Sequence, residues 1–215
     1  MERREDQRRD ERRRRLRGGR VSKPPEERRR ELLETAMRLF TERGYENTSM
    51  RDIAEELGVV QGLCYRYFDS KQKLFGEAME LYAAECCAGF LPVLEDPGLT
   101  LRQKLDQLFG TLAHGEEGMR YHEFFHRHGN EELHEQLSLR LCRHLRPALL
   151  RTLQLAEQRE GLRVRDPATL VDFIVCGQIS LLSRTSAPRP EQIALVREYV
   201  EVLLASQTIS ASTPG

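Results

Sequence analysis

Residues 44–75 constrain the fold more than any other stretch, because they contain two helix starts separated by a very short turn. Ser49 and Asp52 have the spacing of a capping box, in which a hydroxyl and a carboxylate three residues later satisfy free backbone N–H groups at a helix start. Four apolar residues then recur at helical spacing: Met50, Ile53, Ala54 and Leu57. Gly58 is placed to end this helix, and residues 61–68 start the next one. The pattern predicts a helix-turn-helix, whose second helix typically enters a DNA groove.

The rest of the 215-residue chain predicts helices and no sheet. β-Branched and aromatic residues are sparse, alternating strand patterns are hard to find, and 32% of the residues are charged. Proline and glycine divide the chain into about nine helices; Pro92 is expected to break the chain, and Pro147 to kink or split a long helix. Beyond the helix-turn-helix, the expected helices cover roughly 71–90, 100–113, 118–128, 131–160 and 167–184, with a last helix ending near 206.

Composition divides the chain into four regions. Residues 1–23 form an Arg-rich tail with almost no apolar side chains, which we expect to be disordered because it cannot bury enough surface to offset its ordering entropy. Residues 24–75 form the expected DNA-binding domain, residues 76–206 a larger helical domain, and residues 207–215 a flexible tail. Residues 1–75 hold 20 Lys+Arg against 15 Asp+Glu, whereas the remainder holds 14 against 19. A basic end attracts phosphate, but whether the tail contacts DNA stays open.

Over about fifty residues the chain resembles the tetracycline-repressor (TetR) family of bacterial transcription regulators. The segments that carry the resemblance are, in chain order, ELLETAMRLFTERGY, MRDIAEELGV, QGLCYRYF and DSK. The resemblance implies an all-α protein, with a three-helix helix-turn-helix domain followed by a larger ligand-binding and dimerisation domain. It implies a repressor that is not an enzyme and has no cofactor, released from a palindromic double-stranded DNA operator by a small-molecule inducer. An activator, or a DNA-binding protein that needs no ligand, stays open as an alternative. It also implies a homodimer through the last two helices, which is favoured over the alternative that their apolar surfaces only reflect a central place in a monomer core, because a two-fold symmetric operator needs two helix-turn-helix domains.

The resemblance places the DNA contacts on and around the second helix of the helix-turn-helix. Gln61 is expected to bond adenine, Arg66 to bond guanine through its bidentate fork, and Lys71 to anchor a phosphate at a helix N-terminus. Val60 and Leu63 depart from the family pattern, because a Ser or Thr often stands there to cap the helix or to touch phosphate. The predicted DNA-binding residues are Thr48, Ser49, Arg51, Gln61, Gly62, Leu63, Tyr65, Arg66, Tyr67 and Lys71.

Residues 122–126, His-Glu-Phe-Phe-His, match the H-E-x-x-H signature of zinc proteases. His122 and His126 are four residues apart, which places both imidazoles on one helix face, and Glu123 would act as the base. The alternative function is therefore a zinc-dependent hydrolase or a metal-sensing regulator that uses these histidines. Two features oppose it: zincins need a sheet that this chain does not predict, and all six histidines crowd into residues 114–144, which makes a chance match easy.

The second domain is expected to hold the inducer in a pocket. Its apolar and aromatic side chains, with few polar groups, favour a largely apolar ligand, although the same pattern is typical of plain core. Vicinal Cys86 and Cys87 leave open a thiol sensor beside the simpler role of small buried side chains. The predicted ligand-binding residues are Phe90, Phe109, Met119, Tyr121, Phe124, Phe125, Cys142, Phe173, Cys176 and Gln178.

Cysteine usage and hydropathy bear on where the protein works. The five cysteines are odd in number and form no C-x-x-C pair, so reduced thiols are expected rather than a disulfide framework. No apolar run approaches the length of a membrane span, and the Arg-rich N-terminus is not followed by the apolar stretch of a signal peptide. We therefore expect a cytoplasmic protein with no membrane partner.

Overall fold

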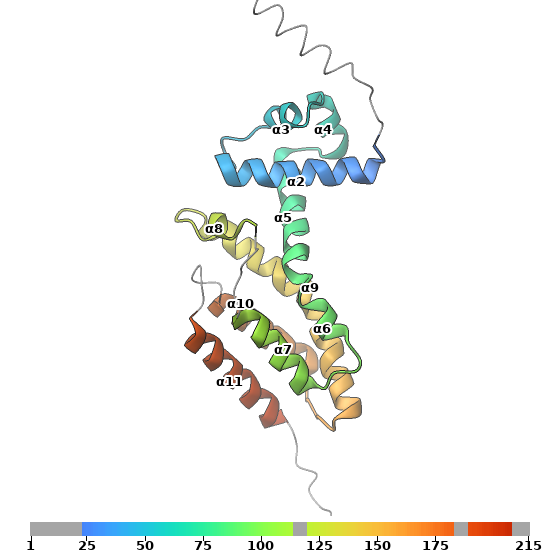
Figure 1. The fold of residues 1–215 in the computed structure, drawn as a ribbon, viewed down its shortest axis with the longest axis vertical. Helices are drawn as coiled ribbons and strands as arrows, with labels where there is room; N and C mark the ends of the chain where they lie inside the picture. Colours follow the sequence, from blue (N-terminus) through green and yellow to red (C-terminus); the bar gives the residue numbers. More distant parts are fainter. Residues whose placement is uncertain (1–22, 114–119, 183–188, 208–215) are drawn as a thin grey trace, which may run out of the picture. The chain divides into compact units, whose positions relative to one another are not determined.

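A computed structural model describes residues 23–113, 120–182 and 189–207 of the chain (Figure 1). These residues form ten α-helices and no strand, which confirms the predicted all-α class. The helices are α2 (Pro25–Arg43), α3 (Met50–Glu56), α4 (Gln61–Tyr67), α5 (Lys71–Cys87), α6 (Leu91–Glu95), α7 (Leu101–Ala113), α8 (His122–Phe125), α9 (Glu131–Arg159), α10 (Pro167–Leu182) and α11 (Pro190–Gln207). The tails predicted at the two ends lie almost entirely outside the described residues.

The chain divides into two compact units, residues 1–79 and 80–215. The division falls within α5, which begins in the first unit and continues into the second as one helix. The domain limits proposed from the sequence, with a change at residue 75, stay a prediction. No helix in the described part of the chain combines the length and the hydropathy that crossing a membrane requires.

The first unit is built on α2, which starts at prolines and ends at a glycine. Pro25 occupies the first turn, where its missing N–H costs nothing, and Gly44 ends the helix with a φ of 89° that side chains rarely adopt. The buried face of α2 carries Phe40, whose ring meets that of Phe75 edge-on at 5.0 Å. Aromatic contacts of this kind add to the hydrophobic burial and fix the start of α5 against α2.

The capping box at the start of α3 forms as predicted. The Ser49 hydroxyl accepts a hydrogen bond from the Asp52 N–H at 3.2 Å, and the Asp52 carboxylate accepts one from the Ser49 N–H at 2.8 Å. Gly58, with a φ of 64°, follows the end of α3, and α4 begins three residues later. Val60, the N-cap of α4, provides no side-chain hydrogen bond, as its apolar side chain predicts.

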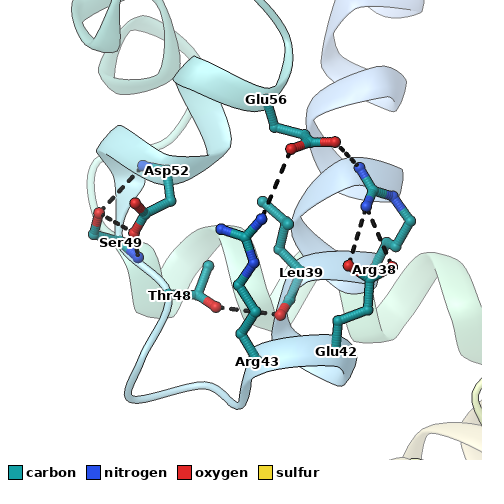
Figure 2. A network of polar contacts seen from close by, with 8 residues as sticks. All are labelled: Arg38, Leu39, Glu42, Arg43, Thr48, Ser49, Asp52 and Glu56. Atoms are coloured by element: carbon teal, nitrogen blue, oxygen red, sulfur yellow. Dashed lines mark hydrogen bonds and ion pairs between the residues drawn. The ribbon is translucent and has the colours of Figure 1, made fainter.

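An ion-pair network fastens α3 to α2 (Figure 2). Glu56, at the end of α3, lies between two guanidinium groups of α2, with atoms 2.6 Å from Arg38 and 3.9 Å from Arg43. Glu42 also accepts from Arg38 at 3.1 Å. A carboxylate at a helix C-terminus is unfavourable toward the helix dipole, and the two arginines offset that cost.

In the second unit, α7, α9, α10 and α11 surround one hydrophobic core (Figure 1). α10 lies along α9, and Arg146 of α9 donates to Asp172 of α10 at 2.5 and 3.2 Å. The backbone carbonyl of Leu94 in α6 accepts from two buried groups, the Lys104 ammonium at 2.5 Å and the Thr152 hydroxyl at 2.9 Å. These bonds tie α6 to α7 and α9, so the unit is held by polar contacts as well as by its apolar core.

The structure corrects three of the predicted helix limits. The helix expected to run to residue 90 ends at Cys87, and Pro92 starts a new helix instead of breaking the chain, because proline in a first turn lacks only an N–H that would be unpaired anyway. Pro147 does not split α9, whose flanking turns are held by packing against α6 and α10. The helix expected at 118–128 is only α8, His122–Phe125. The break expected at residues 114–115 lies outside the described residues.

Candidate nucleic-acid interface and ligand cavity

The short helix α4 is amphipathic, with one side buried and the other exposed to solvent. Cys64 and the following Phe68 are buried against the unit, whereas Gln61, Tyr65 and Arg66 are exposed. Gln61 and Tyr65 are four residues apart, so they are neighbours on the helix surface, and Arg66, the residue after Tyr65, is also exposed to solvent. This face has the mixture of amide, phenol and guanidinium groups that can read base edges and contact phosphates.

Arg66 is available for a new contact. Within the described part of the chain, the structure gives its guanidinium no ion-pair or hydrogen-bond partner. Arg51, by contrast, lies in an ion pair with Glu55 at 3.1 Å on the same helix. A base contact by Arg51 would first break that pair, whereas one by Arg66 would not, which makes Arg66 the stronger candidate of the two.

Thr48 was predicted to contact DNA, and the structure contradicts this. Its side chain is completely buried, and its hydroxyl donates to the backbone carbonyls of Leu39 at 3.2 Å and Gly44 at 3.0 Å (Figure 2). The hydroxyl satisfies carbonyls at the end of α2, so it cannot also reach a phosphate. Ser49 is exposed, and its hydroxyl is engaged in the capping box.

Lys71 holds the loop between α2 and α3. Its ammonium donates to the Tyr45 carbonyl at 3.0 Å and lies 4.1 Å above the centre of the Tyr45 ring. An ammonium has three donors, so a phosphate contact remains chemically open and stays a prediction. Of the remaining predicted DNA contacts, Gly62 is exposed, whereas Leu63 and Tyr67 are half-buried.

The net charge of the DNA-binding region lies in its tail. Residues 23–75 hold ten Lys+Arg and ten Asp+Glu, whereas residues 1–22 hold ten against five. The helix-turn-helix itself therefore has no net positive charge to attract DNA from a distance. DNA binding by this unit would then depend on individual cations of its exposed face, of which Arg66 is the strongest candidate.

The second unit contains a cavity of about 520 Å³. Ligand sites in proteins typically have volumes of about 300–1,000 Å³, so this one can accommodate a small molecule. Phe90, Phe125 and Gln178, all predicted to bind ligand, lie in its wall. Most of the wall was not predicted, and its largest part is a stripe of α9: His134, Leu137, Ser138, Leu141, Leu145 and Leu149.

The other predicted ligand-binding residues lie elsewhere. Phe109 is part of the hydrophobic core, and Phe173 is 68% exposed on α10. Four more are not in the cavity wall: Tyr121, Phe124, Cys142 and Cys176. Met119 lies outside the described residues. The predictions favoured aromatic and sulfur-containing side chains, whereas leucine is the most frequent residue of the wall. The leucine stripe of α9, with a repeat of three or four residues, was the signal that could have found it.

Three histidines of the cavity wall pack against one another. The ring centres of His122 and His126 are 4.1 Å apart, and those of His126 and His134 are 4.7 Å apart. Burial lowers the pKa of all three imidazoles, and for His126, which also has a histidine on either side, the pKa falls to about 4. We call these three residues the histidine cluster.

The metal-binding alternative receives no support from this geometry. His122 and His126 do lie close together, as the H-E-x-x-H spacing predicts. Within the described ranges, however, no three or more His, Cys, Asp or Glu side chains are arranged to hold a metal ion. The zinc hydrolase and the metal sensor are therefore not favoured.

Two cysteines of the second unit, Cys87 and Cys142, have little thiolate character. Burial raises the pKa of Cys87 to about 12. Burial and a hydrogen bond with Cys176 raise that of Cys142 to about 12 as well. A thiol sensor requires thiolate at neutral pH, so Cys87, the buried member of the Cys86–Cys87 pair, is better explained as a packing residue. Cys86 lies in the cavity wall.

Comparisons with known proteins agree with this architecture. The sequence model of the bacterial regulatory proteins of the tetR family matches residues 32–78, which cover most of α2, all of α3 and α4, and the start of α5. The transcriptional repressor KstR2 of Rhodococcus jostii is 36% identical over 81 residues, 38% of this chain and 39% of the relative. The regulator AcrR of Shigella flexneri is 40% identical over 52 residues, 24% of each chain. The matched part spans less than half the length of these curated relatives.

Solved structures extend the similarity to both units, as fold alone. A TetR-family transcriptional regulator of Pectobacterium atrosepticum has a TM-score of 0.59 at 21% identity, over 86% of this chain and 96% of its own. The TetR-family repressor FadR of Thermus thermophilus, in complex with lauroyl-CoA, has a TM-score of 0.55 at 21% identity, over 87% and 99% of the two chains. The matched helix-turn-helix, the regulator relatives and the shared fold all support a regulator of the tetR family of bacterial regulatory proteins.

Proposed function

We propose that the protein is a sequence-specific DNA-binding transcriptional regulator, most simply a repressor that a small and largely apolar molecule releases from a palindromic operator. The observation that carries the proposal is the exposed face of α4, where Gln61, Tyr65 and Arg66 share one side of a short helix in a capped helix-turn-helix. Arg66 would bond a guanine and Gln61 an adenine in the major groove, while Tyr65 would contact phosphate or a thymine methyl group.

Dimer formation would supply two helix-turn-helix units, here called reading heads, one for each half of a palindromic operator. The last two helices, α10 and α11, expose large apolar side chains to solvent, and a monomer would leave this surface in water. The exposed residues are Phe173, Leu181, Leu195, Tyr199 and Val202. An isologous pairing of α10 and α11 with a second copy of the chain would cover them.

The cavity supports a response to a small molecule. Aliphatic side chains are the most frequent in its wall, and α5 contributes Tyr82, Cys86 and Cys87. The start of the same helix packs in the DNA-binding unit. A ligand that favours one position of α5 would therefore favour one spacing of the two reading heads. The ligand must bind that state more tightly than the operator-binding state, because otherwise it shifts no population.

A band-shift titration of the full chain against its own upstream intergenic DNA tests the proposal. Arg66→Ala should weaken specific binding by about 1–3 kcal/mol, or roughly 5- to 150-fold, because it removes a base contact. Arg163→Ala is the matched control, since Arg163 is an exposed arginine of the second unit, between α9 and α10, and should change nothing. Equal affinities of the two variants, or binding that unspecific competitor DNA removes, would contradict the proposed reading head.

A further inference from the structure

Two cysteines of the second unit meet between α9 and α10. Cys142 lies on α9 and Cys176 on α10, and a hydrogen bond joins their thiols. The two helices pack against each other. A disulfide bond is short, so only cysteines whose side chains already meet can form one without a large movement of the backbone. Cys142 and Cys176 therefore meet the first requirement for a disulfide bond.

An ion pair one helical turn away shows that this meeting follows from the packing of the helices. Arg146 follows Cys142 by four residues on α9. Asp172 precedes Cys176 by four residues on α10. Residues four apart are neighbours on a helix surface, and Arg146 donates to both carboxylate oxygens of Asp172, at 2.5 and 3.2 Å. The ion pair and the thiol contact thus agree on one antiparallel register of α9 and α10.

The two thiols differ in exposure, which gives each a different role. Cys176 is exposed to solvent, whereas Cys142 is partly buried. Burial and the hydrogen bond raise the pKa of Cys142 to about 12, so its thiol keeps the proton and donates it to the Cys176 sulfur. A dissolved oxidant would therefore meet Cys176 first, and Cys142 would be the sulfur that closes the bond.

Cys87 is the competing partner, since it also lies close to Cys142. Its side chain is only 1% exposed, and its thiol donates to the backbone carbonyl of Leu141 at 4.0 Å. The first step of oxidation needs a sulfur that solvent can reach. Exposure therefore favours Cys176 over Cys87 as the partner of Cys142.

We propose that Cys142 and Cys176 form a redox-active pair, which a peroxide converts into a disulfide bond between α9 and α10. The Cys176 sulfur attacks one oxygen of the peroxide and becomes a sulfenic acid, and the other oxygen leaves with the thiol proton as water. The Cys142 sulfur then attacks the Cys176 sulfur, the S–O bond breaks, and the hydroxyl leaves with the Cys142 proton as a second water. Two thiols are oxidised, and one hydrogen peroxide is reduced to two waters.

The low acidity of Cys142 is compatible with the second step. The two sulfurs are already in contact, so the attack is intramolecular, and proximity offsets the small fraction of thiolate. The bond would act on the cavity, because Leu141 and Val175, which directly precede the two cysteines, both lie in its wall. It fixes the separation of α9 and α10 at this part of the wall, and it stabilises the fold by restricting the unfolded chain.

Peptide mapping of the full chain under non-reducing conditions tests the proposal. The reduced protein is treated with hydrogen peroxide, free thiols are blocked with N-ethylmaleimide, and the chain is cut with trypsin. Trypsin places Cys142 on the peptide 141–143 and Cys176 on the peptide 166–184. We expect these two peptides to be joined after oxidation and to separate when dithiothreitol is added. The melting temperature should rise by roughly 5–15 °C on oxidation and return on reduction.

Two variants locate the bond. Cys142→Ser nearly keeps the size of the side chain but removes the second sulfur, so the crosslink and the rise in melting temperature should both be lost. Cys64→Ala is the matched control, since Cys64 is buried in the first unit, on α4. It should leave the crosslink and the rise in place. The peptide map of the unmodified chain needs no variant, and so the test stands even if Cys142→Ser fails to fold.

Three results on the unmodified chain would overturn the inference: thiols that peroxide leaves unchanged, oxidation of Cys176 without a crosslink, or a crosslink between other cysteines. The last result includes a bond between Cys142 and Cys87. It also includes a bond between the Cys176 residues of two copies, which a non-reducing gel shows as a species of twice the mass. No step uses DNA, so a protein that binds its operator but forms no crosslink would overturn only the redox pair. A crosslink in a protein that binds no DNA would support the pair and contradict the regulator.

Discussion

The two units of the chain fill their interiors differently. The largest fully buried side chains of the described residues number eleven, and nine of these lie in residues 32–79. The other two, Cys87 and Phe125, belong to the larger second unit, and both lie in the wall of its cavity. The smaller unit is thus the more tightly packed one, whereas the larger unit arranges half-buried leucines around a cavity of about 520 Å³.

This difference fits the two proposed roles. A helix that reads DNA would have to be presented in one geometry, and close packing with the network around Glu56 holds α3 and the turn before α4 in place. A unit that senses a ligand would have to keep space for it, and the side chains that line an empty space forgo dispersion contacts. A ligand that binds only the folded state should then stabilise the second unit by an amount that rises with the logarithm of its concentration above Kd.

Truncating one leucine in each unit tests the comparison with the largest expected effect. Leu39→Ala removes a fully buried side chain of α2 and should lower the free energy of unfolding by about 2–5 kcal/mol. Leu145→Ala removes a half-buried side chain that already faces the cavity, so the loss should be below about 2 kcal/mol. Urea titrations followed by circular dichroism measure both. Equal losses would mean that the cavity wall is packed as closely as the first unit.

The same contrast decides what the sequence could predict. In the first unit the decisive signals are local: Ser49 and Asp52 are three residues apart, and Gly58 follows α3 with a backbone conformation that favours glycine. Both signals were anticipated from the sequence. Thr48 was misassigned, because its hydroxyl bonds a carbonyl nine residues earlier, on Leu39. That partner becomes visible only when α2 and the loop after it are placed together.

The cavity wall could be predicted only in small part, since it is assembled from several helices. Phe109 and Leu145 each belong to a series of apolar residues at helical spacing. Nothing in the local sequence shows that Phe109 faces the core and Leu145 faces the cavity. His134 is eight residues from His126, and the loop before α9 has to turn back before their rings can meet. Periodicity identifies a buried face, but it does not identify which neighbour that face meets.

Acid should weaken the second unit through the histidine cluster. Because burial lowers the pKa of His126 to about 4, the unfolded chain, with an ordinary pKa near 6.5, binds more protons between these two values. The free energy of unfolding is therefore highest above about pH 7, where His126 is neutral in both states. It falls as the pH is lowered toward 4, because only the unfolded chain takes up this proton. His126→Gln should therefore flatten the decline of the melting temperature over this range. The same decline in both proteins would show that His126 does not titrate as its burial implies.

The smallest effect concerns the two capping boxes, one in each unit. Thr100 and Gln103 repeat at the start of α7 the arrangement of Ser49 and Asp52, with the Gln103 side chain accepting from the Thr100 N–H at 2.9 Å. Replacing either cap residue, Ser49→Ala or Thr100→Ala, should cost about 1 kcal/mol at pH 7, measured by urea titration.

Only the first of these boxes contains a titrating group. Hydrogen bonds from the Ser49 hydroxyl and backbone lower the pKa of Asp52, so its contribution to stability is present above its unfolded value of about 3.9 and is lost as the pH falls through the folded value. The cost of Ser49→Ala should therefore shrink between pH 7 and pH 3, while the cost of Thr100→Ala stays constant, because the Gln103 amide does not titrate. If the cost of both substitutions changed in parallel, acid would act on the whole fold and not on the Asp52 carboxylate. The Ser49–Asp52 hydrogen bonds would then contribute less to the stability of the first unit than their geometry implies.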